Sequence, residues 1–391
     1  MSNPPATRVL HVIESTTAGV RRYVTYLLQH QSPQWHMEVA CPIIRQEHFG
    51  DTAFVDEIRQ LGVRVHDVPM QRSIGLSDLH AARVLRQVVR QGQYDLIHTH
   101  SSKAGFLGRS IAQLSGVPVV HTPNGLYYLG QHGIKGWFYQ TLERLAGRLT
   151  TQLIAVSEGE RTVIVHDGLV PPDRLCVIEN GVDASQIRSE AATPHAHQLR
   201  KQLGINGQHP IIGAAGRMVP QKDPLTFVRA AAQLRQTYPT AQFVWCGDGE
   251  LRASTEQLAA QLNVPLIATG HQENSAAIMQ TFDVFVLPSI YEGLPFALLE
   301  AMALGIPIVA TDISGVRDVL GDQQAGWLTE PRNEAALAAT IECALSQPLE
   351  SQRRTQVAQH LVETQYSVQL MVQRHLELYQ HIVQNKNSRS T

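Results

Sequence analysis

Short strand-like runs alternate with longer helical runs along most of the chain. In the first half, "RVLHVIE", "MEVACP", "YDLIHTH" and "VPVVHTP" are short and rich in β-branched residues, with helical patterns between them. The alternation restarts near residue 209 with "PIIGAAG" and "AQFVWCGDG". Strands that alternate with helices at this spacing form parallel sheets covered on both faces. The pattern predicts an α/β fold with two doubly wound, Rossmann-like domains.

The expected domain boundaries follow from a change in the sequence pattern. The chain has 391 residues, too many for one comfortable core. A polar stretch without strand signals divides it, so we expect a first domain at 1–184, a linker with a helical turn or two at 185–208 and a second domain at 209–365. A C-terminal helix at about 366–386 is expected to pack back onto the first domain.

Composition excludes several classes of protein. Lys and Arg number 32 and Asp and Glu 34, a formal charge of -2, which argues against binding to nucleic acid in bulk. Four cysteines without a CxxC pair argue against a zinc or disulfide framework and fit a reducing cytosol. Neither a signal peptide nor an apolar run of about 20 residues is evident. We expect a cytoplasmic protein that is at most peripheral at the inner face of the membrane.

The loops that follow strands are the candidate sites, because doubly wound sheets bind ligands at the carboxyl ends of their strands. The loop "AAGRMVPQKD" carries Arg217 and Lys222, five residues apart, and opens a helix. Fixed cations beside a positive helix end suit a diphosphate. The alternative is two solvated surface charges. The position after a strand favours the functional interpretation.

Two acids stand in the apolar stretch "LPSIYEGLPFALLEAMALGIPIVAT", which is predicted to form a loop, a helix and a strand. Glu292 falls in the loop and Glu300 about one turn into the helix. A carboxylate among apolar groups is costly unless it is hydrogen-bonded, so Glu300 needs donors. Sugar hydroxyls would serve; a salt bridge to Arg or Lys, or simple exposure, is the alternative.

Three further loops carry weaker signals. "ESTTAGVRRY" contains Gly19, which lets the backbone approach an anion at a helix N-terminus, or which marks an ordinary turn. "WCGDGELR", with Gly247, and "ATGHQEN", with Gln272, are nucleotide-facing loops or simple turns.

Together these loops resemble the retaining GT-B glycosyltransferases of family 4. "GRMVPQKD", "GDGE", "TGHQEN" and the stretch with the two acids resemble the donor-binding half of that family. "STTAGVRRYV", "IHTHSSKAGFLGR", "VSEGE" and "VIENGVD" resemble its N-terminal half, so the resemblance covers nearly the whole chain. It implies the GT-B fold, in which two Rossmann-like domains face each other across a cleft.

The resemblance also implies roles. Arg217 and Lys222 match the cations that hold the donor diphosphate. Glu300 matches the acid that binds the ribose hydroxyls, and Glu292 the one that contacts the transferred sugar. The remaining donor-binding residues are Gly19, Gly247, Gln272, Gly293, Leu294 and Pro295.

One position departs from the family pattern. Many relatives carry a His in the loop that here reads "HTPNGLYY", and Asn124 stands at that place, three residues after His121. Either His121 takes the role at the sugar or Asn124 makes a neutral contact; His121 could equally be a packed strand-end histidine. His98 and His100 are expected to be structural.

The implied reaction is transfer from a nucleoside diphosphate sugar, UDP rather than GDP, to a hydroxyl group with retention of configuration. No convincing DxD-like acidic pair is present, so we expect no metal and no cofactor. The family suggests a lipid-linked or polysaccharide acceptor, as in exopolysaccharide assembly. Two alternatives are a nucleotide-sugar epimerase of related architecture and a non-catalytic nucleotide-sugar sensor.

The segment "LYYLGQHGIKGWFYQTLERLAGRLT" mixes aromatic and basic residues: Trp137, Phe138 and Tyr139 with Lys135, Arg144 and Arg148. It is either an amphipathic surface that recruits a lipid-linked acceptor to a membrane or a core-facing aromatic stripe with a solvated basic face. The sequence alone favours the second interpretation.

Overall fold

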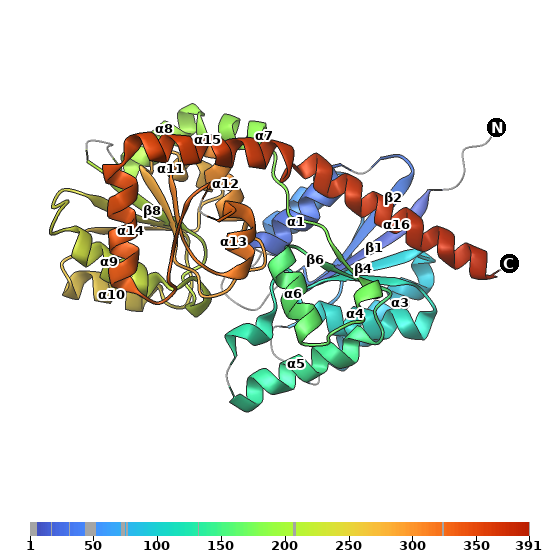
Figure 1. The fold of residues 1–391 in the computed structure, drawn as a ribbon. Helices are drawn as coiled ribbons and strands as arrows, with labels where there is room; N and C mark the ends of the chain where they lie inside the picture. Colours follow the sequence, from blue (N-terminus) through green and yellow to red (C-terminus); the bar gives the residue numbers. More distant parts are fainter. Residues whose placement is uncertain are drawn as a thin grey trace. The chain divides into compact units, whose positions relative to one another are not determined.

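The computed structural model describes residues 6–16, 18–30, 32–43, 52–71, 75, 77–131, 133–205, 209–322 and 324–390. The chain divides into two compact units (Figure 1). The first unit is Met1–Glu179 with Gln369–Thr391, and the second unit is Asn180–Val368.

The first unit is built on a seven-stranded parallel sheet in the order β3-β2-β1-β4-β5-β6-β7. Its strands are β1 (Thr7–Ile13), β2 (Trp35–Cys41), β3 (Val65–Asp67), β4 (Leu96–His100), β5 (Val119–Thr122), β6 (Gln152–Ala155) and β7 (Leu175–Val177). Its helices are α1 (Ala18–Gln29), α2 (Thr52–Gln60), α3 (Ser77–Gly92), α4 (Ser102–Ser115), η1 (Tyr127–Gly130), α5 (Gly133–Gly147), α6 (Glu158–His166), η2 (Pro172–Arg174) and α16 (Val368–Ser390).

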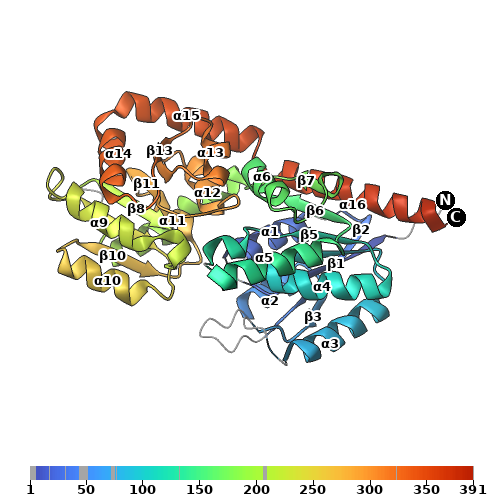
Figure 2. The ribbon, with the colours of Figure 1, turned by 60° about the horizontal axis from the view of Figure 1, so that its bottom comes forward.

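The two faces of this sheet have different chemistry, because successive side chains of a strand alternate between faces. Leu10 and Val12 of β1 pack with Ala81 and Leu85 of α3 in an apolar core. The opposite face carries buried histidines, over which α1 and α16 contribute side chains. Figures 1 and 2 show α16 running along this unit.

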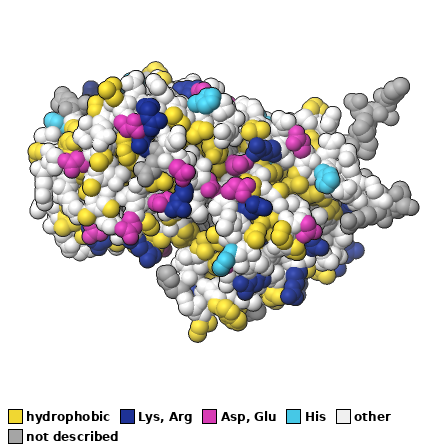
Figure 3. Space-filling model, viewed as in Figure 1, with side chains coloured by type: hydrophobic (Ala, Val, Ile, Leu, Met, Phe, Trp, Pro, Cys, Tyr) yellow, Lys and Arg dark blue, Asp and Glu magenta, His cyan; other side chains and the backbone are white. Residues whose placement is uncertain are grey.

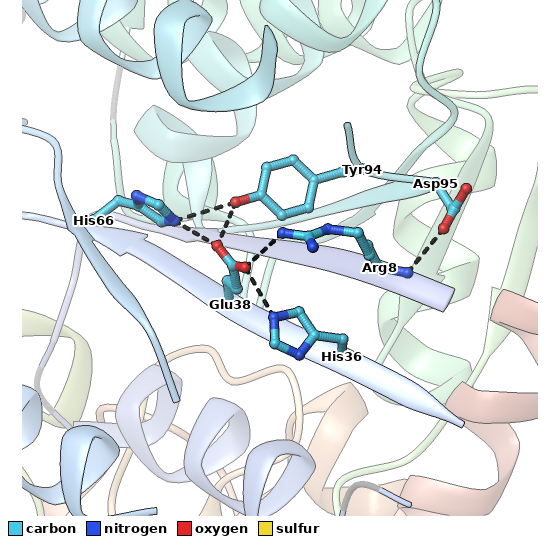
Figure 4. Close-up of polar contacts among 6 residues, drawn as sticks. All are labelled: Arg8, His36, Glu38, His66, Tyr94 and Asp95. Carbon is cyan, nitrogen blue, oxygen red and sulfur yellow. Dashed lines mark hydrogen bonds and ion pairs between the residues drawn. The ribbon is translucent and has the colours of Figure 1, made fainter. Parts of the chain in front are cut away.

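A buried carboxylate lies on the α3-covered face of the first sheet (Figure 4). Glu38 of β2 accepts hydrogen bonds from Tyr94 Oη (2.6 Å) and Arg8 Nη2 (2.8 Å), and His36 and His66 also contact it. Burial opposes its ionisation, but the hydrogen bonds from Tyr94, His66 and His36 outweigh burial and lower its pKa to about 2. Arg8 is the second residue of β1, so this cluster lies toward the amino ends of the strands, away from the edge where such sheets bind ligands.

The second unit is built on a six-stranded parallel sheet in the order β10-β9-β8-β11-β12-β13. Its strands are β8 (Ile211–Ala215), β9 (Gln242–Cys246), β10 (Leu266–Gly270), β11 (Val284–Leu287), β12 (Ile308–Thr311) and β13 (Trp327–Thr329). Its helices are α7 (Ala184–Ala191), α8 (Pro194–Gln202), η3 (Pro220–Lys222), α9 (Pro224–Leu234), α10 (Arg252–Gln261), α11 (Ser275–Met279), α12 (Phe296–Leu304), α13 (Ser314–Leu320), α14 (Glu334–Ser346) and α15 (Pro348–Thr364).

Both faces of the second sheet are covered. Ile212 and Ala214 of β8 belong to a core with residues of α9, α10 and α14. Gly213, between them, faces the other way, where Phe282 packs against it directly after α11. The predicted α/β, doubly wound architecture is confirmed in both units. In each sheet the strand order reverses beside the first strand of the unit, between β1 and β4 and between β8 and β11, and these are the topological switch points.

The stretch 185–208, predicted as a linker with a helical turn or two, belongs instead to the second unit in its described part. It forms α7 and α8, which pack against α11 and α12 within the second unit; residues 206–208 lie outside the described part. Asp183 and Thr193 cap the two helices, and Ile187 and Ala191 are buried. Good caps and a few apolar contacts are enough for short helices that a polar composition conceals.

Helix α5 also differs from the expectation that its aromatic residues face the core. Trp137 and Phe138 are exposed, and its buried residues are Gly136, Glu143, Ala146 and Gly147. The core-facing interpretation is therefore wrong for Trp137 and Phe138, whereas the partly buried Tyr139 packs against the core. No helix of the described residues combines the length and apolar character needed to cross a bilayer.

Candidate active site

The loops after β8 and β11 meet at the switch point of the second unit, because these strands are neighbours. Lys222, at the end of the β8 loop, forms an ion pair with the Glu292 carboxylate in the β11 loop. Gln221 Nε2 donates to the Tyr291 carbonyl (3.0 Å) and to Glu292 Oε2 (3.2 Å). Ile290 N–H donates to the Gln221 carbonyl at 2.8 Å. The structure thus joins two residues that lie 70 positions apart in the sequence.

This ion pair is largely shielded from water, with side-chain exposures of 14% for Lys222 and 7% for Glu292. Each charge compensates the other, which a shielded ion requires. Arg217 lies on the same loop and is exposed. The loop therefore offers one shielded cation and one exposed cation, and an anionic ligand could attract both.

Glycines let the β8 loop and the neighbouring β9 loop approach closely. A Cβ on Gly247 would lie 2.1 Å from the Gly216 carbonyl oxygen, and one on Gly249 would lie 2.4 Å from that of Met218. Trp245 Nε1 donates to the same Gly216 oxygen (2.8 Å), and Met218 N–H donates to the Asp248 carbonyl (2.9 Å). Gly247 therefore positions the loop that carries Arg217 and Lys222.

The second acid lies in α12, where the sequence places it. Glu300 is 4% exposed, and Ser275 Oγ lies 3.4 Å from its Oε2. Pro295 occupies the N-cap position of the helix, and the carbonyl of Leu294 accepts a hydrogen bond from Asn180 Nδ2 (2.7 Å). Gly315 packs on Gly293, where a Cβ would lie 1.8 Å from the carbonyl oxygen. The stretch before α12 is thus held on both sides.

Two polar groups near this loop were missed by the sequence interpretation. Ser289, directly after β11, is fully buried, and its Oγ has no hydrogen-bond partner among the described residues. The same holds for Asn180 Oδ1. Both stand in segments already singled out, "LPSIYEG" and "VIENGVD", but nothing in a sequence shows which hydroxyl or amide will be buried. Gln272 stands apart, because its loop follows edge strand β10, and its Nε2 donates to the Thr269 carbonyl (2.8 Å).

In the first unit, the structure separates the two candidates of the β5 loop. His121 is fully buried; its Nδ1 lies 2.9 Å from Thr99 Oγ1, and its ring packs beneath Gly105 of α4. Burial and then the nearby Arg109 guanidinium hold its pKa well below the usual range. Its Nε2 has no partner within the described chain. This geometry fits a packed, neutral, strand-end histidine.

Asn124 is less buried and adopts a left-handed backbone conformation, with φ +55°. Its Nδ2 donates to the Thr122 carbonyl (3.3 Å), whereas its Oδ1 is without a described partner. Gly19 is exposed in the first turn of α1, after β1. The loops that carry Asn124 and Gly19 follow β5 and β1, which are separated in the sheet by β4.

Glu160 was not singled out from the sequence, although "VSEGE" contains it. Its carboxylate accepts hydrogen bonds from Gly125 N–H (3.0 Å) and Val156 N–H (2.8 Å) and so ties the loop after β5 to the end of β6. Burial raises its pKa to about 7, against those two hydrogen bonds. Ser157 caps α6 through Glu160 N–H, and a Ser followed three residues later by Glu is the signature of a capping box. Here, however, the carboxylate accepts from Val156, one residue before the cap, and from Gly125 of the neighbouring loop.

Among the described residues, one histidine group has metal-binding geometry. Ring nitrogens of His11, His98 and His100 all lie within 4.8 Å of one another. His98, however, uses both of its ring nitrogens, on Thr122 Oγ1 (2.8 Å) and on the hydroxyl of Tyr379 in α16. We interpret the group as a hydrogen-bonded part of the core.

The fold of the chain is the one that GT-B glycosyltransferases share. The structure is similar to HepE of Anabaena in complex with UDP-glucose, with a TM-score of 0.80, 21% identity, and coverage of 96% of this chain and 99% of that one. It is also similar to the lipopolysaccharide glycosyltransferase WaaG, with a TM-score of 0.71, 16% identity and coverage of 94% and 98%.

Comparison of the sequence with known protein families identifies the family of this chain. The family "Glycosyl transferases group 1" matches residues 196–360, and "Glycosyl transferase 4-like domain" matches residues 18–181. An Escherichia coli protein named UDP-Gal:alpha-D-GlcNAc-diphosphoundecaprenol alpha-1,3-galactosyltransferase is 34% identical over 278 residues, covering 68% of this chain and 71% of that protein. The putative glycosyltransferase EpsF of Bacillus subtilis is 29% identical over 317 residues, covering 79% and 80%. The chain belongs to the group 1 glycosyltransferases and is a transferase of the EC 2.4 type.

Proposed function

We propose that the protein transfers a sugar from a UDP-sugar to a hydroxyl group of a lipid-linked or polysaccharide precursor, with retention of anomeric configuration. The Lys222–Glu292 ion pair at the β8–β11 switch point carries this proposal, because it puts a cation and a carboxylate where doubly wound sheets bind ligands. Relatives whose names include a UDP-sugar and a diphosphoundecaprenol substrate support the choice of donor and acceptor.

In this proposal the second unit binds the donor. Lys222 and Arg217 neutralise the negative charge that grows on the leaving diphosphate, so they bind the transition state better than the ground state. Glu292, with the backbone of the stretch Gly293, Leu294 and Pro295, contacts the transferred sugar. Glu300 accepts hydrogen bonds from the ribose hydroxyls. Protein cations then do the work of a metal ion, and no metal or cofactor is required.

The proposed chemistry needs no carboxylate nucleophile. The acceptor oxygen bonds to the anomeric carbon on the face from which the diphosphate departs. The bond to the diphosphate oxygen breaks with its electron pair, and that phosphate takes the acceptor proton. Asn124 makes a neutral contact with the sugar, and the buried His121 supports the strand end beneath it. We place the reaction at the cytoplasmic face of a membrane.

A panel of nucleotide sugars tests the proposal. The purified protein is heated with each donor to find the one that stabilises it, and that donor is then incubated with and without acceptors. We expect UDP-sugars to stabilise the protein and a product of retained configuration to appear only with acceptor. A free epimer in the donor-only reaction would show an epimerase, and binding without turnover across acceptors would show a sensor.

Replacing Lys222 by Ala tests the Lys222–Glu292 ion pair, on which the proposal rests. We expect turnover to fall by about 10²–10³-fold, because removing one preorganised group that stabilises transition-state charge has that cost. Lys201→Ala, at an exposed position of α8 in the same unit, is the matched control and should turn over like wild type. Undiminished turnover in a folded Lys222→Ala protein rejects the role at the diphosphate.

A further inference from the structure

Helix α5 is turned with its large apolar residues outward. Ile134 is 85% exposed and Trp137 63%, and Phe138 and Leu145 are also exposed. These residues recur at helical spacing and therefore share one face. The opposite face buries small residues and one acid, Gly136, Glu143, Ala146 and Gly147, and the partly buried Tyr139 packs against the core on that side. An ordinary amphipathic helix of a globular protein has the reverse arrangement.

The orientation of α5 is set by contacts on its small face. A Cβ on Gly147 would lie 1.9 Å from the carbonyl oxygen of Leu169, so the helix rests directly on that backbone. Glu143 forms a buried ion pair with Arg109 of α4, with 2.7 Å between Oε2 and Nη2. Rotating α5 to bury Trp137 would expose or break this pair. The apolar face is therefore held toward solvent.

The exposed charged side chains of α5 itself are all basic. Lys135, Arg144 and Arg148 are exposed, and the only acid of α5 is Glu143, which is buried in its ion pair. A hollow of about 570 Å³ at the C-terminal end of α5 is lined by Arg144, Arg148 and Arg174, with Leu169 and Val170 beside them. Figure 3 shows hydrophobic and basic side chains next to each other on the surface over α5.

We propose that this surface docks on an anionic phospholipid bilayer: the exposed apolar residues of α5 enter the interface, and the arginine-lined hollow takes a phosphate headgroup. A helix with a strongly apolar face and basic flanks lies in the plane of such an interface. A second copy of the chain fits less well, because two such basic faces would repel each other. The proposal deepens the proposed function, since a lipid-linked acceptor would be met at this surface.

Vesicle pelleting tests the docking, with phosphatidylcholine vesicles compared with vesicles that also contain phosphatidylglycerol. We expect the wild-type protein to bind the anionic vesicles, more weakly as salt is raised. Ile134→Ser combined with Trp137→Ser should abolish binding. Arg148→Gln combined with Arg174→Gln should weaken it by about fivefold per arginine, since a basic residue near such a surface contributes about 1 kcal/mol.

Matched controls lie elsewhere on the molecule. Leu349→Ser removes an apolar side chain that is 82% exposed on α15, and Arg86→Gln combined with Arg90→Gln removes two exposed arginines of α3. Both should bind vesicles like wild type. Equal binding to neutral and anionic vesicles, or wild-type binding by the α5 variants, overturns the proposal. Displacement of the protein from vesicles by soluble glycerol phosphate also overturns it. So does a dimer in solution that is absent from the Ile134/Trp137 variant.

The outcome is separable from that of the proposed function. All these variants should keep wild-type transfer to a water-soluble acceptor. If the wild-type protein transfers sugar but does not bind anionic vesicles, only the proposed membrane docking is rejected. Docking without any transfer by the wild-type protein rejects only the proposed reaction.

Discussion

Two buried carboxylates of the first unit show how strongly surroundings decide the state of a residue. Glu38 is surrounded by Tyr94, Arg8 and two histidines, and its pKa is lowered to about 2. Glu160 accepts only backbone hydrogen bonds, and burial raises its pKa to about 7. The first therefore stays charged at neutral pH, whereas the second is partly protonated.

The raised pKa of Glu160 predicts a pH-dependent stability. Between the ordinary value of 4.5 and about 7, the folded protein binds a proton that the unfolded chain releases. Stability from this group is therefore complete below 4.5 and lost as pH rises through 7, by about 2–3 kcal/mol between pH 5 and pH 8. We expect Glu160→Gln to remove this loss, as measured by urea unfolding of both proteins at the two pH values.

The difference between wild type and Glu160→Gln isolates this group from the buried histidines, whose lowered pKa values act in the opposite direction. Burial and then His375 lower the pKa of His11 to about 3. Below pH 6.5 the unfolded chain therefore binds a proton at His11 that the folded protein does not, and stability falls. A difference between the two proteins that stays constant with pH would contradict the assignment to Glu160.

At the scale of elements, the candidate site depends on loops that pack backbone against backbone. The β8 and β9 loops meet at Gly216 and Gly247, and Gly293 meets Gly315. Side chains at these points would push the loops apart. The positions of Lys222 and Glu292 thus follow from glycines that carry no chemistry themselves.

Gly247→Ala should damage both stability and donor binding. The new Cβ would meet the Gly216 oxygen at 2.1 Å, at a φ of +144° that L residues rarely adopt. We expect a loss of about 3 kcal/mol or more and weaker stabilisation by UDP. Gly204→Ala is the control, because Gly204 has φ +72° with nothing within 4 Å of a new Cβ. It should cost about 1 kcal/mol and leave donor binding unchanged; equal behaviour of the two variants would contradict the packing role.

At the scale of the molecule, the chain makes two units with different continuity. The second unit is one uninterrupted segment, Asn180–Val368, with its own sheet and core. The first unit is closed by α16, from which His375 and Tyr379 hydrogen-bond to Tyr23 and His98. Of the two units, only the second is therefore formed by one continuous segment of the chain.

The fragment Asn180–Val368 is therefore expected to fold alone. At a UDP concentration one hundred times its Kd, binding contributes about 2.7 kcal/mol, which raises Tm by about 5–10 °C for a domain of this size. Calorimetry with and without UDP measures the shift, and the Lys222→Ala fragment should show a smaller one. A fragment without a cooperative transition would show that the second unit depends on the first.

The sequence was sufficient for the fold class and the family. The period of strands and helices fixes a doubly wound sheet, and ligands of such sheets bind at loops that follow strands, so the β8 and β11 loops could be found without coordinates. It was insufficient where the outcome depends on a partner distant in sequence. Nothing in "VSEGE" shows that Glu160 reaches Gly125, and the polar stretch of α7 and α8 conceals its buried side.

By itself the sequence determined two α/β units, the loops at their carboxyl ends and the family, because periodicity and short motifs are local properties of a chain. Only the tertiary structure decided that Lys222 pairs with Glu292, that His121 is packed while Asn124 stays less buried, and that α5 exposes Trp137 and Phe138. These outcomes depend on which backbones approach closely and which charges are buried together. Such contacts form between segments far apart in the chain, so they cannot be predicted from a local sequence pattern.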